Sequence, residues 1–251
     1  MSESIDFETY LVHSTAIGKM KLPQSLWNIE DVYDAVMDIS KDGMTMDYIE
    51  GGSFVHHYKC LEEVYKAIII GAEAHLKSIG IGDNLKNLQL NVVKSWFNIL
   101  EPGSVSNPRH NHAEAHLSFT FYPQVPLSLE ATRVLYFWKN GYFDPNNLYP
   151  GFIEQVGDPT QSSSDQRTRN WFAQMPVTGD VHYFPAGLDH ETVANGSMTE
   201  YRDTPTRVEN RDDLKNMRIC IGGDILITAK KDFQNPRVLM PIETWRTFET
   251  E

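Results

Sequence analysis

The sequence is poor in cysteine and in positive charge, and it has no apolar run of membrane-spanning length. Two cysteines, Cys60 and Cys220, make no disulfide framework, which predicts a reducing, cytoplasmic setting. The polar and acidic start, residues 1–6, predicts no secretory leader. Lysine and arginine number 22 against 34 aspartate and glutamate, giving a net charge of −12. That deficit argues against nucleic acid or an anionic membrane as the main partner.

The chain is long enough to bury a substantial core. It has 251 residues, 41% of them hydrophobic, which is compatible with a single domain over 1–251. Apolar residues near helical spacing predict one helix ending at about Ile39 and another over about 60–78. Helices then give way to short strands, expected at 88–93, 95–100, 117–122, 133–138, 180–193 and 217–221. This order predicts an α+β protein, mainly β, with a sandwich or barrel core over about 85–230 after a helical part over about 1–84.

One long connection interrupts the predicted strands. Residues from about 140 to 176 are rich in Asp-Pro, Asn and Ser, which is typical of loops. A connection of that length in a compact domain is usually functional or disordered. Its aromatic residues, such as Tyr149 and Trp171, favour a lid that packs on the rest of the molecule.

Metal-binding residue types gather between residues 110 and 116. His110, His112, Glu114 and His116 alternate immediately before a predicted strand. On an extended backbone, alternate residues share one face, so all four could project into one pocket. Imidazole and carboxylate suit a first-row metal such as iron, manganese or zinc.

A distant histidine, His190, follows a tight Pro-Ala-Gly turn and would complete the site. Two ligand sets remain open: His112, Glu114 and His190, or His110, His112 and His190. Either set leaves coordination positions open, as in non-haem Fe(II) oxygenases. His116 is also a candidate for supporting the ligands, whereas His182, at an alternating strand position, is expected to be structural.

Arg218 is unusual because it lies on an apolar predicted strand. A buried arginine needs a carboxylate partner, ideally a bidentate one. That partner could be a protein aspartate or glutamate, or a carboxylate of a dicarboxylic cosubstrate.

Several of these motifs together resemble a 2-oxoglutarate/Fe(II)-dependent oxygenase family. The resembling segments are Trp96-Phe97-Asn98, Pro108 to His112, Leu117-Ser118 with Tyr122, Gly179-Asp180, Phe184-Pro185, His190 and Arg218-Ile219. The resemblance covers roughly residues 15 to 228. The connection at 140–176 and the loop at 195–216 are longer than usual for the family, so Arg202, Arg207 and Arg211 compete with Arg218.

The resemblance implies a double-stranded β-helix, or jelly roll, flanked by N-terminal helices. It implies an oxidoreductase, a hydroxylase-type dioxygenase, that uses Fe(II), O2 and 2-oxoglutarate on a small-molecule or protein side-chain substrate. His112 and His190 would be the catalytic iron ligands, completed by Glu114 or His110. Arg218 would bind 2-oxoglutarate, and Asn98, Ser118 and Tyr122 would line the cosubstrate site.

Two rival interpretations share the predicted fold. Gly179, Pro185, Gly187, His190 and Asn195 nearly reproduce the second motif of cupins, and a cupin-type metal enzyme would need no 2-oxoglutarate. The other rival is a non-catalytic jelly-roll binding or structural protein without a metal.

Overall fold

The structure is a computed structural model that describes residues 15–40, 54–100, 109–112, 114–126, 133–138, 171–194, 208–233 and 238–246. Both predicted helices are confirmed, as α1 (Ile29–Ser40) and α2 (Glu62–Ser78). Within the described residues, no helix has the length and apolarity needed to cross a bilayer.

The remaining elements form two antiparallel sheets. The larger sheet has the order β1-β6-β3-β8-β2 and the smaller the order β5-β4-β7. The strands of the larger sheet are β1 (Gly18–Lys21), β2 (Leu88–Leu100), β3 (Leu117–Gln124), β6 (Asp180–Pro185) and β8 (Arg218–Ala229). Those of the smaller sheet are β4 (Arg133–Trp138), β5 (Trp171–Gln174) and β7 (His190–Ala194). The prediction of an α+β protein that is mainly β is therefore confirmed in its coarse form.

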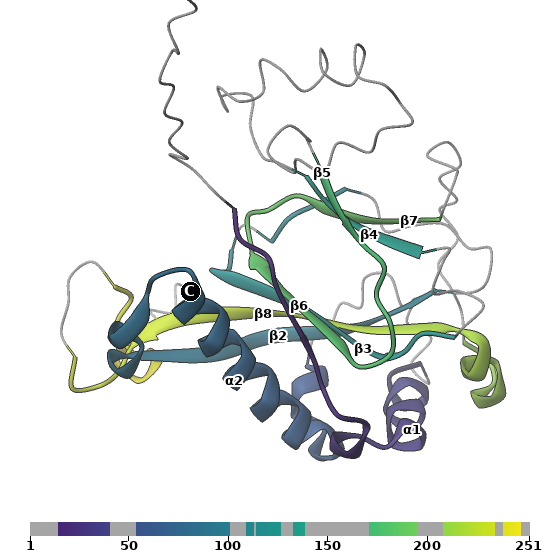
Figure 1. Cartoon of the computed structure of the whole chain (residues 1–251). Coiled ribbons are helices and arrows are strands. Elements are labelled where there is room, and N and C mark those ends of the chain that lie inside the picture. Colours follow the sequence, from purple (N-terminus) through teal and green to yellow (C-terminus); the bar gives the residue numbers. More distant parts are fainter. Residues whose placement is uncertain are drawn as a thin grey trace, which may run out of the picture.

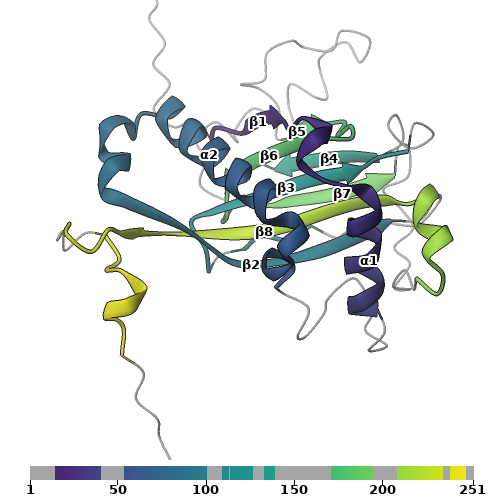
Figure 2. The same cartoon turned by 90° about the horizontal axis from the view of Figure 1, so that it is seen from below.

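The helices cover one face of the larger sheet, and the smaller sheet lies across its other face (Figures 1 and 2). Because side chains alternate along a strand, every strand contributes to both faces. The helix-facing residues form the main core with α1 and α2; among them are Phe97, Phe119, Phe121, Val181, Ile219 and Ile221. A small apolar cluster joins the two sheets, where Phe137 of β4 packs on Phe184 of β6 at 5.0 Å between ring centroids.

The other face of the larger sheet carries polar side chains among aromatic ones, and the register aligns its residues in rows across the strands. One row contains Phe184, Ser118, Asp224 and Lys94. The next contains His182, Thr120, Gly222 and Trp96. Cys220 and Asn98 form a third pair, and Arg218 lies at the same end of β8. This inner face holds the candidate site.

Two sequence predictions need correction. The extended segment expected over 110–116 is wrong, because the strand begins only at Leu117 and the preceding residues form an isolated bridge and a turn. The loop expected up to about Pro176 is wrong at its end, since β5 pairs with β4. The rest of the proposed lid, residues 139–170, lies outside the described residues, as does the loop at 195–207.

Candidate metal centre

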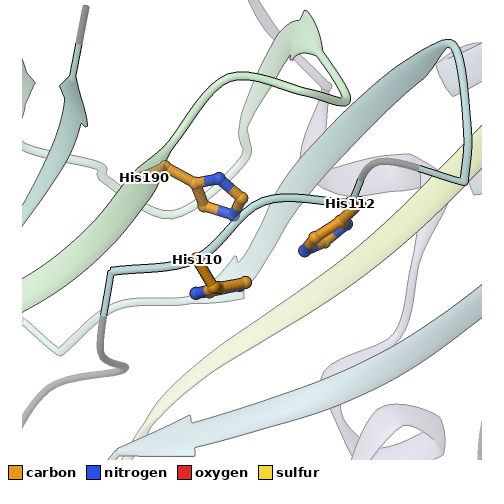
Figure 3. A group of neighbouring side chains, drawn as sticks. All are labelled: His110, His112 and His190. Atoms are coloured by element: carbon orange, nitrogen blue, oxygen red, sulfur yellow. The ribbon is translucent and has the colours of Figure 1, made fainter. Parts of the chain in front are cut away.

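Three histidines from two distant parts of the chain, His110 with His112 and His190, meet on the inner face (Figure 3). The backbones of His110 and His190 are paired: His110 N donates to His190 O at 3.0 Å, and His190 N donates to His110 O at 2.8 Å. His112 is held by its own backbone N–H, which donates to Ala186 O at 2.8 Å. As a result, one ring nitrogen from each histidine lies within 4.8 Å of the others. These three could hold one metal ion.

Hydrogen bonds to Nδ1 orient the rings of His112 and His190. His112 Nδ1 lies 2.6 Å from Asp224 Oδ1, and His190 Nδ1 lies 3.0 Å from Leu188 O. Since both partners are acceptors, each Nδ1 is placed to donate its N–H, and in the neutral ring Nε2 is then the nitrogen that can bind a metal. Burial and, to a smaller extent, the neighbouring His110 together lower the pKa of His190 to about 3. A neutral imidazole is the form that binds a metal.

Asp224 is a functional candidate that the sequence patterns did not reveal. Its side chain is fully buried on β8, and Oδ1 accepts hydrogen bonds from both His112 and Ser118, the latter at 2.6 Å. Oδ2 lies 3.4 Å from Lys94 Nζ. A carboxylate that receives the outer N–H of a ligating histidine orients the ring and raises its basicity. The only signal in the sequence was a single acidic residue at the start of an apolar run.

The structure separates Glu114 and His116 from the three histidines. A turn begins at His112, whose carbonyl accepts from Ala115 N at 3.2 Å. The Glu114 side chain is 60% exposed and pairs with Lys94, whose ammonium lowers the pKa of that carboxyl. His116 Nδ1 accepts from Ile227 N at 2.9 Å. The one-face arrangement expected for all four residues is therefore wrong, because it assumed a strand where the chain turns.

Arg218 lies in the same pocket and is 2% exposed. Its Nη2 donates to Tyr122 Oη at 3.3 Å, and its guanidinium carbon lies 4.9 Å from the Tyr122 ring centroid. Its Nε and Nη1 have no hydrogen-bond partner, and no carboxylate of the described residues pairs with it. The competing Arg211 is bound at the surface by Glu30 and Asp34, while Arg202 and Arg207 lie outside the described residues.

Of the three other residues predicted to bind the cosubstrate, two line the pocket and one does not. Asn98 and Tyr122 line the pocket, and Asn98 Oδ1 is buried without a hydrogen-bond partner. Ser118 is not among the lining residues, because its hydroxyl is committed to Asp224 behind His112.

Trp96 and Gly222 shape the pocket between the histidines and Arg218. The Trp96 ring lies 5.0 Å from the His112 ring between centroids. A Cβ at Gly222 would come within 2.8 Å of Trp96 Cε2 and Cζ2, much closer than carbon atoms pack. The missing side chain at 222 therefore makes room for the indole.

Comparison with known proteins gives one family match. The family described as "Putative 2OG-Fe(II) oxygenase" matches residues 94–204, a span that contains the three histidines and ends before Arg218. A comparison with curated proteins finds no match.

Several solved structures are similar to the chain at low identity. A Pseudomonas putida prolyl-4-hydroxylase is 12% identical, with 85% of this chain and 93% of that chain covered and a TM-score of 0.45. The carbocyclase SnoK from nogalamycin biosynthesis is 13% identical, with coverage of 88% and 85% and a TM-score of 0.43. A Trichoplax adhaerens prolyl hydroxylase, in complex with a hypoxia inducible factor peptide, is 11% identical, with coverage of 83% of each chain and a TM-score of 0.42.

The family match confirms the resemblance that the motifs predict. That family implies Fe(II) and 2-oxoglutarate as cofactors, and the three histidines could bind the iron. Over residues 94–204, this chain resembles the 2OG-Fe(II) oxygenases.

Proposed function

We propose that this protein is a 2-oxoglutarate- and Fe(II)-dependent dioxygenase of the hydroxylase type. His110, His112 and His190 hold the iron, and Arg218 binds the far carboxylate of 2-oxoglutarate. The observation that carries the proposal is a buried arginine that has no carboxylate partner among the described residues and shares a pocket with the three histidines. The proposed ligands are thus the all-histidine set, in preference to the set that contains Glu114.

The environment of Arg218 supports a carboxylate ligand. A buried arginine stays charged, and burying a charge without a partner is strongly unfavourable. Its planar guanidinium can bind a carboxylate through two parallel N–H···O bonds. The N–H groups of Nε and Nη1, which have no acceptor among the described residues, can donate these bonds. Tyr122 Oη, already in contact with Nη2, is placed to add a further hydrogen bond to the same anion.

The surrounding residues support the chemistry by holding the site rigid and dry. When bound, iron and 2-oxoglutarate supply the oxidising power, with one oxygen atom of O2 going to the substrate and the other to succinate as CO2 is released. Asp224 keeps the His112 ring in its ligating orientation, and the carbonyl of Leu188 does the same for His190. Phe184, 4.7 Å from the His190 ring between centroids, and Trp96 exclude water from the ligands' flanks.

The fold and setting belong to the same proposal. The larger and smaller sheets are the two sheets of a double-stranded β-helix within a single domain, with α1 and α2 supporting the larger one. Cys60 and Cys220 are both free, which suits the reducing cytoplasm that the cysteine count predicts.

Succinate formation tests the proposal. Purified protein is incubated with Fe(II), ascorbate, O2 and 2-oxoglutarate, and the expected result is succinate that is lost in His190→Ala. A parallel test measures 2-oxoglutarate binding to the Fe(II)-loaded protein under nitrogen. Arg218→Met should weaken that binding about 10- to 100-fold, as expected for lost hydrogen bonds to a charge. The matched control is Arg211→Met, a surface arginine on the other side of the sheet.

The same measurements separate the rivals. A cupin-type enzyme would bind metal through the three histidines. It would show no 2-oxoglutarate binding, so there would be no binding for Arg218→Met to weaken. A non-catalytic binding or structural protein would bind neither. A metal-loaded protein that forms no succinate and is not stabilised by 2-oxoglutarate would overturn the proposal.

A further inference from the structure

His182 is a buried histidine whose two ring nitrogens both lack hydrogen-bond partners within the part of the chain that the structure describes. It lies on β6 and is 0% exposed. A buried polar group without a partner costs on the order of tenfold or more in folding equilibrium, so buried histidines are normally hydrogen-bonded. The sequence pattern predicted a structural role, but a structural histidine would have a bonded nitrogen. The unpaired nitrogens indicate a missing partner.

The sheet register places His182 beside the proposed cosubstrate site. It is two residues from Phe184, so both side chains lie on the inner face of β6. His182 is not itself a lining residue of the pocket, but across the strands its row continues through Thr120 and Gly222 to Trp96, and these three residues line it. Its ring lies 5.8 Å from the Tyr122 ring between centroids, in an edge-on orientation. Tyr122 is the residue that contacts Arg218.

The charge state of His182 determines which partner it can take. Burial and, to a smaller extent, the positive charges of Lys19 and Arg218 together lower its pKa to about 4, so the ring is neutral near pH 7. A neutral imidazole has one N–H donor and one acceptor nitrogen. A carboxylate oxygen satisfies the donor, and a water molecule or hydroxyl satisfies the acceptor.

We propose that His182 is a second cosubstrate-binding residue, whose N–H donates to the carboxylate held by Arg218. The inference rests on the proposed function, because the carboxylate is that of 2-oxoglutarate. Two charged hydrogen bonds from Arg218 and one each from Tyr122 and His182 would suit the four lone pairs of a carboxylate.

Calorimetric binding of 2-oxoglutarate to the Fe(II)-loaded protein under nitrogen tests this role. His182→Leu should raise the dissociation constant about 10- to 100-fold, and His182→Gln, which keeps an N–H donor, should recover part of that loss. Metal affinity should stay unchanged in both. The control is His75→Leu, which removes another buried histidine from α2, where it stacks on Tyr183 outside the site.

Three outcomes are distinguishable. Unchanged 2-oxoglutarate binding in a folded His182→Leu overturns the inference and leaves the proposed function standing. Absence of 2-oxoglutarate binding in the metal-loaded wild type overturns the proposed function itself. Equal losses in His182→Leu and His75→Leu, without recovery in His182→Gln, would reduce His182 to a packing residue and also overturn the inference.

A measurement on the wild type covers the case in which His182→Leu does not fold. With Zn(II) in place of iron, nuclear magnetic resonance of ¹⁵N-histidine-labelled protein reports the ring N–H groups, and the His182 signal is assigned by its loss in His182→Gln. Adding 2-oxoglutarate should shift the His182 N–H downfield and slow its exchange with water. A signal that does not respond to saturating 2-oxoglutarate contradicts the proposal.

Discussion

The two faces of the larger sheet are built from the same strands but treat their polar atoms differently. On the helix-facing side, Ser95 Oγ accepts hydrogen bonds from Tyr65 Oη and His56 N, at 2.9 and 2.8 Å. Tyr183 Oη donates to Ile68 O at 2.9 Å. On the inner side, polar atoms of Asn98, His182 and Arg218 are buried with no hydrogen-bond partner among the described residues.

This contrast separates stability from binding within one sheet. The helix-facing side buries apolar side chains and satisfies its few polar groups, so it stabilises the fold. The inner side retains unpaired hydrogen-bonding groups, which cost stability and become favourable only when a ligand satisfies them. Substitutions on the two sides should therefore have separable effects.

Phe121→Ala on the helix-facing side should have the largest effect on stability. Phe121 is fully buried and packs edge-on against Trp27 at 5.1 Å between centroids. Removing a buried phenylalanine costs about 3–5 kcal/mol in the free energy of unfolding, which denaturant titration measures. Iron affinity of the folded fraction should be retained. A large loss of iron affinity without loss of stability would contradict the separation of the faces.

On the inner side, His182 should make stability depend on pH. The unfolded imidazole takes up a proton as the pH falls through about 6.5, whereas the folded one does so only near pH 4. The unfolded state therefore binds more protons in this window. As the pH falls, this group alone lowers the free energy of unfolding by up to about 3 kcal/mol. Measured at pH 7, 6 and 5, the unfolding free energy of wild type minus that of His182→Leu should decrease as the pH falls. Parallel profiles would refute the prediction.

Asp224→Asn should weaken metal binding about 10- to 100-fold, as other losses of a carboxylate behind a ligating histidine do. The amide is a weaker acceptor for the His112 N–H, so the ring loses basicity and orientation. Competition with a metal indicator measures the affinity. Asp212→Asn is the control, since that exposed carboxylate only pairs with Lys215. Wild-type affinity in Asp224→Asn would show that the 2.6 Å contact has no role in the site.

Glu114→Gln should have the smallest effect and sharpens the choice of ligand set. Its exposed pair with Lys94 contributes at most about 1 kcal/mol to stability. Metal affinity should change by less than about fivefold, which corresponds to the same energy. A loss as large as that of His110→Ala would instead make Glu114 a ligand.

Regular periodicity explains which parts of the fold could be predicted from the sequence. Helices α1 and α2 follow from apolar spacing, and the central strands from alternation, because burial on one face leaves that pattern. His112 and His190 were also accessible, since tight turns and paired histidines are local features. The pairing of the strands into two sheets joins segments far apart in sequence, and no local pattern encodes it.

The remaining site residues depend on contacts that a sequence does not display. Asp224 is 112 residues from His112, and its role becomes visible only when β8 and β3 are aligned. Glu114 was overestimated because a turn follows His112, which alternation alone does not reveal. Arg218 was singled out as a buried charge, but only the structure shows that no described carboxylate pairs with it.

The close approach of Gly222 to Trp96 has a consequence for protein engineering. Any side chain at position 222 must displace the indole, and the indole stands against the ring of His112. Residues 96 and 222 are thus one design variable rather than two. A library that enlarges residue 222 will yield well-packed variants only where residue 96 is made smaller at the same time, and each such exchange would move empty space from one strand to its neighbour on the same wall of the pocket.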